Sequence, residues 1–435
     1  MKWPLKWVGI NANTKATQGP TRNIVFNSLE NEFLSCSLTG ETITPQKAFT
    51  IYRQNSTVAS DVDMIADAFE QIVPVLKLKD GTVIDKHPLL DLLKQPNSYM
   101  DYSGFAARVA RHYLLTKDCP MYALGVSTMP PQEIYPVRPT FLSYSTNGNE
   151  YVDVYRVGSG VAQGTYKQEL SKNKIARYYD KLGLKELYRI TGFSSMSTDA
   201  QPDSPLQAAA LETSQQLKGK ISNVQLLSNG GRPSMLIIFK DTGVDDDEMK
   251  RRIQALNEKL AGEEKSGTIA AVEGGEVQSV TEMGKTPKDM DWAVLHNTSD
   301  KAIHFRFRIP LPLVSTDATT FDNMATGVEM LYDFAVLPLA DKIYSGWSRF
   351  LLPRFKIAIG DAEITYNKDS LQPLKKRMLD ELEQRKKIGV ETTNEIREAM
   401  PNREPLPKGD VLYQNVTLAP MGMDINDDGG GDDVE

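Results

Sequence analysis

The hydrophobic positions in the first half of the chain change between helical and strand spacing. The apolar stretches predict, in order, a helix at 58–72, a strand at 73–78, a short helix at 87–93 and a helix with Phe105, Val109 and Tyr113 on one face. Residues 121 to 191 alternate more like strands, with breaks at glycine and proline. We therefore expect an α+β block, preceded by a flexible arm at residues 1–45, where periodicity is weak.

Two long helices are predicted on either side of a small insert. The first opens at Ser204, which can cap a helix, with Pro205 suited to the first turn. The second starts near Thr286 and runs to about Arg308. Between them the pattern predicts a β-α-β-β insert, with a strand at Met235–Phe239, a helix at Asp245–Leu260 and a hairpin of strands at 268–272 and 276–281.

A third long helix is predicted from about Phe321 to Leu352. It follows a polar loop, because Pro310 and Pro312 stop the helix before them. Pro338 lies inside the third helix and is expected to kink it, since proline has no backbone N–H and its ring clashes with the preceding turn.

The last helical signals are a stop followed at once by a start. A helix with apolar residues at 371, 374, 378 and 382 carries basic residues near its end and stops at Gly389. Thr392 is then spaced to cap the next helix, and Glu395 stands three residues on, where it can close a capping box. These signals predict a helical hairpin near the end of the chain.

Charge and composition narrow the classes of function. The net charge is −7 and the isoelectric point is near 5.4, whereas a protein that grips duplex DNA normally carries a basic excess. The longest apolar runs have the length of a strand, far short of the about 20 residues of a membrane span, so no membrane contact is expected. Cys36 and Cys119 show no disulfide or zinc-ligand pattern.

The sequence predicts no catalytic site and no cofactor. The histidines, His87, His112, His296 and His304, lack ligand spacing, so packing or surface positions are expected for them. Asp245 to Glu248 could ligate a metal, but carboxylates are also favoured at a helix N-terminus. Asp424 to Glu435 matches the calcium-loop pattern without a helix on each side. We expect a solvated acidic tail and leave open whether it binds calcium.

The order of several short motifs resembles a known family. They are His87-Pro88-Leu89, Leu92-Leu93 and Pro96-Asn97, then Ser204-Pro205-Leu206, Leu337-Pro338, and last Gly389-x-x-Thr392-x-Asn394-Glu395-x-Arg397 with Pro405 and Gly409-Asp410. This order resembles phage portal proteins of the HK97 type over roughly residues 48 to 413. The chain departs from the family pattern at Lys117–Tyr122 and lacks the usual Leu-Leu-Gly after Pro310.

The resemblance implies an α+β portal fold, with an α/β wing, a two-helix stem that flanks a small α/β clip, a long kinked wing helix and a C-terminal helical crown. The parts would be an N-terminal arm at 1–45, wing at 46–204, stem helix at 205–231, clip at 232–285, second stem helix at 286–309, tunnel loop at 310–322, wing helix and strand at 323–365, crown at 366–415 and disordered acidic tail at 416–435. The crown signature, Gly389, Thr392, Asn394, Glu395 and Arg397, would serve capping and subunit contacts.

By the same resemblance, the chain would be one subunit of a ring, normally a dodecamer, at one vertex of a phage capsid. The ring would be the channel for packaging and ejection of double-stranded DNA, beside the major capsid protein or scaffold. Terminase large subunit and later head–tail adaptors would dock on it, in the host cytoplasm during assembly and then in the virion. Val314, Ser315, Thr316 and Asp317 are candidates for the narrowest part, since small polar side chains touch DNA without holding phosphates.

Two other classes of function remain open from the sequence. A different non-enzymatic virion ring or head–tail adaptor would share the acidity, although adaptors are usually shorter and lack paired long helices around an insert. A metal-dependent nucleic-acid enzyme would use Asp245 to Glu248 as ligands and would cleave DNA when purified.

Overall fold

A computed structural model gives the fold of the chain. It describes residues 43–410 except 126–128, 146–151, 153, 161, 171–175, 180–184, 196–200, 229–234, 240–250, 252–276, 283–291, 315–320, 389–391, 399–403 and 408. The chain divides into a unit of Met1–Thr42 and a unit of Ile43–Glu435, and all described residues belong to the second. No helix among them is long and apolar enough to cross a membrane.

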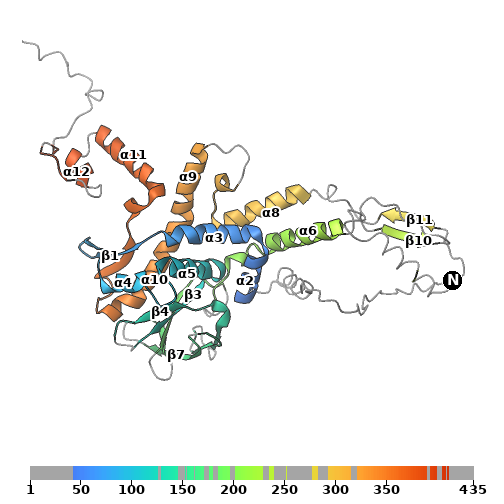
Figure 1. Ribbon diagram of the computed structural model, residues 1–435, viewed down its shortest axis with the longest axis horizontal. Helices are drawn as coiled ribbons and strands as arrows, with labels where there is room; N and C mark the ends of the chain where they lie inside the picture. Colours follow the sequence, from blue (N-terminus) through green and yellow to red (C-terminus); the bar gives the residue numbers. More distant parts are fainter. Residues whose placement is uncertain are drawn as a thin grey trace, which may run out of the picture. The chain divides into compact units, whose positions relative to one another are not determined.

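The first part of the described chain is helical (Figure 1). The helices are α2 (Pro45–Gln54), α3 (Ser56–Glu70), α4 (Pro88–Lys94) and α5 (Tyr102–Thr116). Each helix is preceded by a capping residue whose side chain accepts a hydrogen bond from a backbone N–H of the first turn. These capping residues are Thr44, Asn55, His87 and Asp101 in turn. The predicted stripe of α3 faces the core, where Val58, Ile65 and Phe69 are buried. The predicted helices of this region are confirmed.

Two antiparallel sheets accompany these helices. The smaller has the order β12-β1-β2, from β1 (Pro74–Leu78), β2 (Val83–Ile84) and β12 (Ala362–Tyr366). The larger has the order β4-β3-β9-β8-β7-β6-β5, from β3 (Asp118–Leu124), β4 (Glu133–Pro136), β5 (Leu142–Ser145), β6 (Val154–Val157), β7 (Gly164–Leu170), β8 (Ala176–Tyr179) and β9 (Lys185–Thr191). The prediction of strands between residues 121 and 191 is confirmed.

The core lies where α10 (Leu337–Leu351) packs against both sheets, through β9 and β12. The rings of Tyr188 and Phe350 stack with their centroids 4.9 Å apart, and Trp347 is 1% exposed. Gly346 permits this close packing, because a Cβ there would lie 2.6 Å from Ile190 Cδ1. Beside α10, Arg354 forms a buried ion pair with Glu186 of β9.

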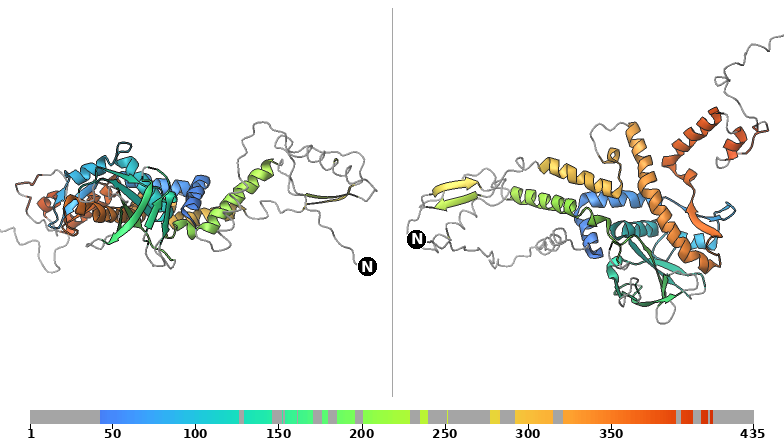
Figure 2. Two further views of the ribbon diagram at one scale, coloured as in Figure 1. Left: turned by 90° about the horizontal axis from the view of Figure 1, so that it is seen from below. Right: turned by 180° about the vertical axis from the view of Figure 1, so that it is seen from behind.

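The paired long helices are α6 (Ala210–Ser228) and α8 (Trp292–Phe307), which lie side by side (Figure 2). Between them in the chain, β10 (Met235–Phe239) pairs antiparallel with β11 (Val277–Glu282). The predicted strand at 235–239 is confirmed. The predicted helix at 245–260 and strand at 268–272 lie outside the described residues, apart from Arg251.

The start of α6 differs from the prediction. Ser204 does cap a turn, accepting the backbone N–H of Leu206, but this turn is the 3-10 helix η2 (Pro205–Gln207), and α6 begins only at Ala210. The carbonyl of Pro205 accepts a bond from Arg306 Nε at 2.8 Å, and the backbone N–H of Ala209 bonds to Leu206 instead. The first turn is therefore tightened, as is common at helix ends.

The predicted third helix is interrupted. It consists of α9 (Phe321–Leu331), a π-helical turn, η5 (Tyr332–Val336), and α10. Pro338 is the second residue after the π turn and has no N–H to donate to the carbonyl of Phe334 four residues earlier. Arg308 Nη1 donates to that carbonyl at 3.1 Å, so a side chain from the end of α8 replaces the missing bond.

The buried His112 predicts a loss of stability in acid. Its ring is 4% exposed and packs edge-on against Phe49, and burial, with the charges of Arg108 and Arg138, lowers its pKa from 6.5 to about 3. As the pH falls below 6.5, the unfolded chain binds a proton at His112 and the folded chain does not. The free energy of unfolding that neutral His112 contributes is therefore fully present above pH 6.5 and is lost as the pH falls toward 3.

Between pH 7 and pH 5 this group alone should cost about 2 kcal/mol of unfolding free energy. Urea unfolding of His112→Phe should therefore show a weaker pH dependence than the wild-type chain by that amount. His87→Asn keeps a capping side chain on α4 and is the control. An equal pH dependence in the wild-type chain and His112→Phe would contradict the assignment.

Candidate functional site

The strongest polar site of the described residues lies where α3 meets the two long helices. Asp300 of α8 accepts hydrogen bonds from Thr57 Oγ1 at 2.7 Å and from Gln216 Nε2 of α6 at 2.5 Å. Gln216 in turn accepts from Asn55 Nδ2 at 2.7 Å, and the side chains of Asn55 and Gln216 are buried. One carboxylate therefore connects three helices.

A second contact ties α8 to α3 one turn further along. Asp61 is fully buried, and its carboxylate lies 2.8 Å from His304 Nδ1. Burial raises the pKa of Asp61, the hydrogen bond and charge of His304 lower it, and the charge of Asp300 raises it again. We call Asn55, Thr57, Asp61, Gln216, Asp300 and His304 the polar junction.

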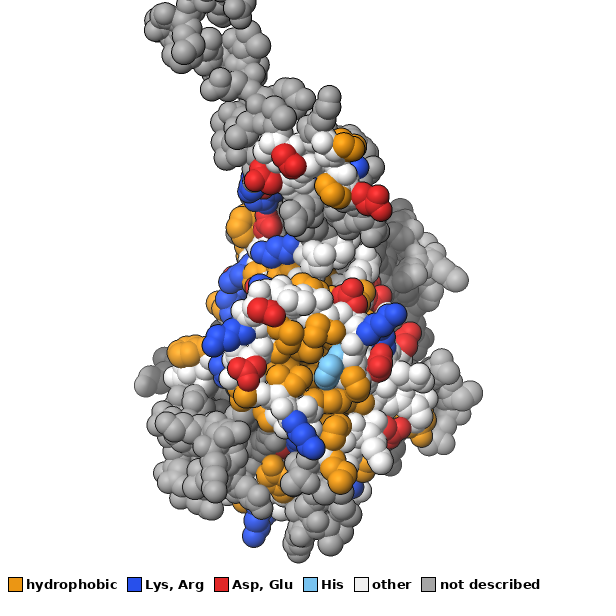
Figure 3. Space-filling model, turned by 90° about the vertical axis from the view of Figure 1, so that its left-hand side faces the viewer, with side chains coloured by type: hydrophobic (Ala, Val, Ile, Leu, Met, Phe, Trp, Pro, Cys, Tyr) orange, Lys and Arg blue, Asp and Glu red, His pale blue; other side chains and the backbone are white. Residues whose placement is uncertain are grey.

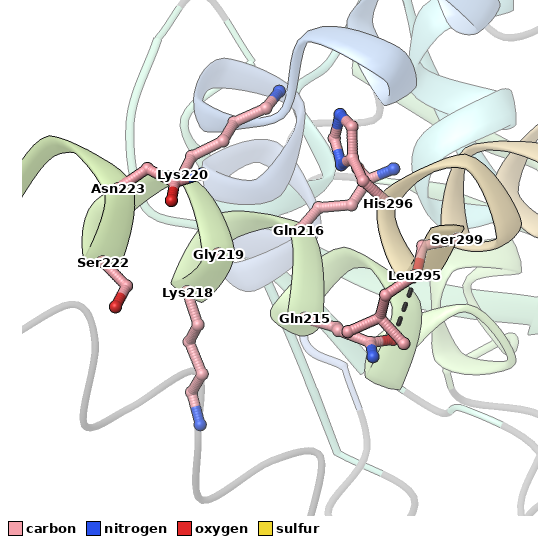
Figure 4. A pocket seen from close by; sticks show the side chains of 10 residues that line it. All are labelled: Gln215, Gln216, Lys218, Gly219, Lys220, Ser222, Asn223, Leu295, His296 and Ser299. Carbon is pink, nitrogen blue, oxygen red and sulfur yellow. Dashed lines mark hydrogen bonds between the residues drawn. The ribbon is translucent and has the colours of Figure 1, made fainter. Parts of the chain in front are cut away.

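A cavity of about 510 Å³ lies beside the polar junction, between α6 and α8 (Figure 4). Its lining is mostly uncharged, and Ser299 Oγ of α8 donates to Gln215 Oε1 of α6 at 3.0 Å across one side. His296 points toward this space, with its Nε2 3.5 Å from Asp300 Oδ2. These groups hold two helices together; among the described lining residues, no nucleophile is paired with a base.

Metal chemistry gains no support from the described residues, which include no group of three histidine, cysteine or carboxylate side chains that could hold an ion. Asp245 to Asp247 and the acidic tail, which carried the metal alternatives, lie outside the described residues, as does Glu248. The buried Cys119 has a raised pKa because it lies out of reach of water, so its thiol stays protonated.

Of the tunnel-loop candidates, only Val314 is described. It follows η4 (Leu311–Leu313), and its backbone N–H bonds to the carbonyl of Leu311 at 3.1 Å. Ser315, Thr316 and Asp317 lie outside the described residues. Leu313 packs against Gly327 of α9, where an added Cβ would lie 3.2 Å from its side chain. The turn before the loop is therefore held close to α9.

The C-terminal signature follows α11 (Gln372–Ile388). It forms a small hydrogen-bonded motif from α12 (Thr393–Glu398), its capping residue and the segment after it. Thr392 and Glu395 make the predicted capping box, with each side chain bonded to the other's backbone N–H at 2.7 and 3.2 Å. Arg397 Nε donates to the carbonyl of Glu404 at 2.8 Å. Gly389 lies outside the described residues.

Asn394 is the centre of this motif. Its amide donates to the carbonyl of Leu406 and to Asp410 Oδ1, and its Oδ1 accepts the backbone N–H of Leu406. Gly409 must be glycine, because any Cβ would overlap the Asn394 side chain. The residues of the signature therefore fix a turn, which explains their spacing without any catalytic role.

Sequence reasoning missed the polar junction. The sequence predicts packing or surface positions for the histidines and gives no sign of the roles of Gln216 and Asp300, because their partners are far away in the chain. One signal was available: Asp61 stands three residues after Val58 and four before Ile65, on the apolar face of α3. An acidic residue on such a face indicates a buried partner.

Removing the Asp300 carboxylate should destabilise the chain. Asp300→Ala leaves Thr57 and Gln216 without an acceptor, and hydrogen bonds to a charged group contribute about 1.5–3 kcal/mol each. We expect urea unfolding to show a loss of about 2–4 kcal/mol. Asp333→Ala, which removes an exposed ion pair with Arg377, is the control and should cost about 1 kcal/mol or less. Equal losses in the two variants would refute the importance of the junction.

Comparisons with known proteins bear on the whole arrangement. An uncharacterized protein of Rickettsia bellii (strain RML369-C) is 30% identical over 330 residues, which cover 74% of this chain and 80% of that protein. A chain from the neck of a native gene transfer agent particle, computed with C12 symmetry, is similar with a TM-score of 0.54 and 20% identity, covering 83% of this chain and 95% of that one.

An HK97 family phage portal protein from Corynebacterium diphtheriae is similar with a TM-score of 0.51 and 14% identity, covering 78% of this chain and 97% of that one. These likenesses show a shared mixed helix and sheet fold. A family model described as phage portal protein matches residues 56–400, which include α3, the polar junction apart from Asn55, both long helices and the capping box of α12. A match over so much of the chain makes it a member of the phage portal protein family.

Proposed function

We propose that the chain is the repeating subunit of a portal ring at one vertex of a capsid, through which double-stranded DNA is packaged and later ejected. Membership of the portal family supports this role. The similar chain from a particle neck computed with C12 symmetry supports a ring of twelve copies. The ring would belong to the virion and would assemble in the host cytoplasm.

The observation that carries the proposal is the pair α6 and α8 with β10 and β11 between them in the chain. This arrangement fits a stem of two helices, one leading into a clip and one returning from it. The polar junction would then anchor the stem to the wing, which includes α3 and the larger sheet. The hairpin of α11 and α12 would form the crown.

The clip would be the docking surface, first for the terminase large subunit and later for head–tail adaptors, while the wing would contact the major capsid protein or scaffold. The portal itself would do no chemistry. ATP hydrolysis by the docked terminase would drive the DNA, and the ring would supply the opening. Its acidic balance, with a net charge of −7 per chain, suits a channel that lets phosphates slide past.

Purified full-length protein should form a ring with a mass close to twelve times the 48.5 kDa of one chain. Native mass spectrometry or mass photometry measures this directly. A chain that stays monomeric at every concentration and salt condition tested would contradict the proposed function. DNA cleavage by the purified protein with Mg²⁺ or Mn²⁺ would instead favour the metal-dependent enzyme.

A lysine in the tunnel loop should impede the passage of DNA. Asp317→Lys places a cation in every subunit of the ring, and because lysine holds phosphates, we expect about tenfold less DNA protected from nuclease in assembled particles. Asp317→Asn removes the charge without adding a cation and should package normally. Particles of Asp317→Lys that fill at the wild-type rate would show that the loop does not touch DNA.

A further inference from the structure

A cleft of about 410 Å³ lies at the C-terminal end of α8. The predicted clip precedes the N-terminal end of this helix in the chain. The walls of the cleft come from the C-terminal end of α5, the turn after β9, the end of α8, the π turn η5 and the start of α10. These are segments far apart in sequence. None of the polar-junction residues lines this cleft.

Cations dominate the polar lining of this cleft. Lys117 lies half-buried at its wall, while Arg306, Arg308 and Lys342 are exposed around it. Burial and the charges of Arg306, Arg308 and Lys342 lower the pKa of Lys117 to about 8, so the four groups repel one another in the folded chain. We call the cleft that these four side chains line the cationic cleft.

Among the residues that the structure describes, none that lines the cationic cleft carries a carboxylate. Nor does any ion pair among the described residues involve one of its four cations. Their contacts are to carbonyls and a ring: Arg306 to Pro205, Arg308 to Phe334, and Lys117 with its Nζ 4.7 Å from the centre of the Tyr113 ring. Lys117 is the half-buried member of the four, and half-buried or buried arginines elsewhere in the chain are paired, such as Arg111 with Asp63 and Arg189 with Asp118. In a chain with net charge −7, this local concentration of positive charge attracts an anion from outside.

The backbone also holds the cations in place. Lys117 has φ of 51° and Arg308 has φ of 61°, in the left-handed region that residues other than glycine seldom adopt. Arg308 ends α8 with the backbone N–H of Ile309 bonded to the carbonyl of His304, so a position that usually takes glycine carries a long cation instead. Glycine would adopt both backbone conformations with less strain, yet both positions carry a long cationic side chain.

The border of the cleft indicates what kind of anion enters. Phe193 is 80% exposed and Phe334 is 54% exposed, and both line the cleft. Arginine beside exposed aromatic rings is the composition of protein interface centres, whereas a phosphate backbone gains nothing from exposed phenylalanine. The surroundings therefore favour a carboxylate on a protein over a phosphate on DNA.

Hydrophobic side chains gather on the face that Figure 3 shows, with a histidine among them. This face offers no charge or shape that identifies an occupant, so the cationic cleft is the better defined surface.

We propose that the cationic cleft is a contact between subunits, which receives an acidic side chain from a second copy of this chain in the ring. The proposal rests on the proposed function, since it needs a ring. An inserted carboxylate would accept from the guanidinium groups of Arg306 and Arg308 and pair with Lys117 and Lys342. Because Arg308 also bonds to the π turn through Phe334, the neighbouring copy would brace the join of α8 with α10.

The test uses the full-length chain with Lys117→Asn and Lys342→Glu combined. Asparagine tolerates the left-handed backbone at 117, and Lys342 is exposed on α10, so the fold should be retained, as circular dichroism can verify. Mass photometry over a dilution series should show the concentration for half-assembly of the ring rising at least about tenfold. The control, Lys79→Asn with Lys86→Glu, makes the same change of charge at exposed positions outside the cleft and should assemble as the wild-type chain does.

Carbodiimide cross-linking gives a second readout that needs no variant. The reagent joins a lysine amine to a carboxylate in direct contact, and peptide mass spectrometry of the ring fraction should find Lys117 or Lys342 joined to an acidic peptide. Mixing chains labelled with ¹⁵N and ¹⁴N shows whether the two peptides come from different copies. The single variant Lys342→Gln should remove the Lys342 cross-link if the double variant fails to fold.

The outcomes separate the two proposals. A wild-type ring with an unchanged half-assembly concentration in the double variant, and no cross-link between copies, would overturn the cleft contact and leave the portal function standing. A ring that assembles normally but loses affinity for duplex DNA in fluorescence anisotropy would assign the cleft to phosphate and also overturn the contact. A wild-type chain that never forms a ring would overturn both.

Discussion

The structure depends on the way α3 holds the two long helices. Asp300 and Asp61 are carboxylates largely withdrawn from water, and a buried charge is tolerated only where hydrogen bonds replace its hydration. Thr57 and Gln216 supply those bonds to Asp300, and His304 supplies one to Asp61. Apolar packing would let helices slide along one another, whereas directed bonds to a carboxylate fix their register. If α6 and α8 form the proposed stem, this junction would give it a fixed base.

Local signals in the sequence predicted local structure well. The capping box of Thr392 and Glu395, the helix predicted at 58–72 and the strands predicted between residues 121 and 191 follow from side chains near one another in the chain, and all are confirmed. The family was also predicted correctly, from the order of short motifs, and the match over residues 56–400 confirms it. Motif order succeeds because turns and helix starts constrain residue identity directly.

Contacts from elsewhere in the chain account for the rest. Ser204 was read as the start of α6, but Arg306 binds the carbonyl of Pro205 and tightens the first turn. Pro338 is expected to kink one helix; the structure adds a π turn just before it, and Arg308 satisfies the carbonyl that proline leaves. No periodicity in the sequence reveals these partners, nor that Lys117 and Lys342 share a cleft with them. The roles of the tunnel-loop residues 315–317 and of Gly389 stay predictions, because these residues lie outside the described part of the chain.

Cryo-electron microscopy of the purified full-length protein tests the portal assignment most directly. The account predicts closed rings with rotational symmetry, seen end-on with a central opening, in which α6 and α8 of each copy run beside the channel axis and lead to β10 and β11 at one end. Images that contain only single chains, or an assembly in which α6 and α8 face away from any central opening, would contradict it.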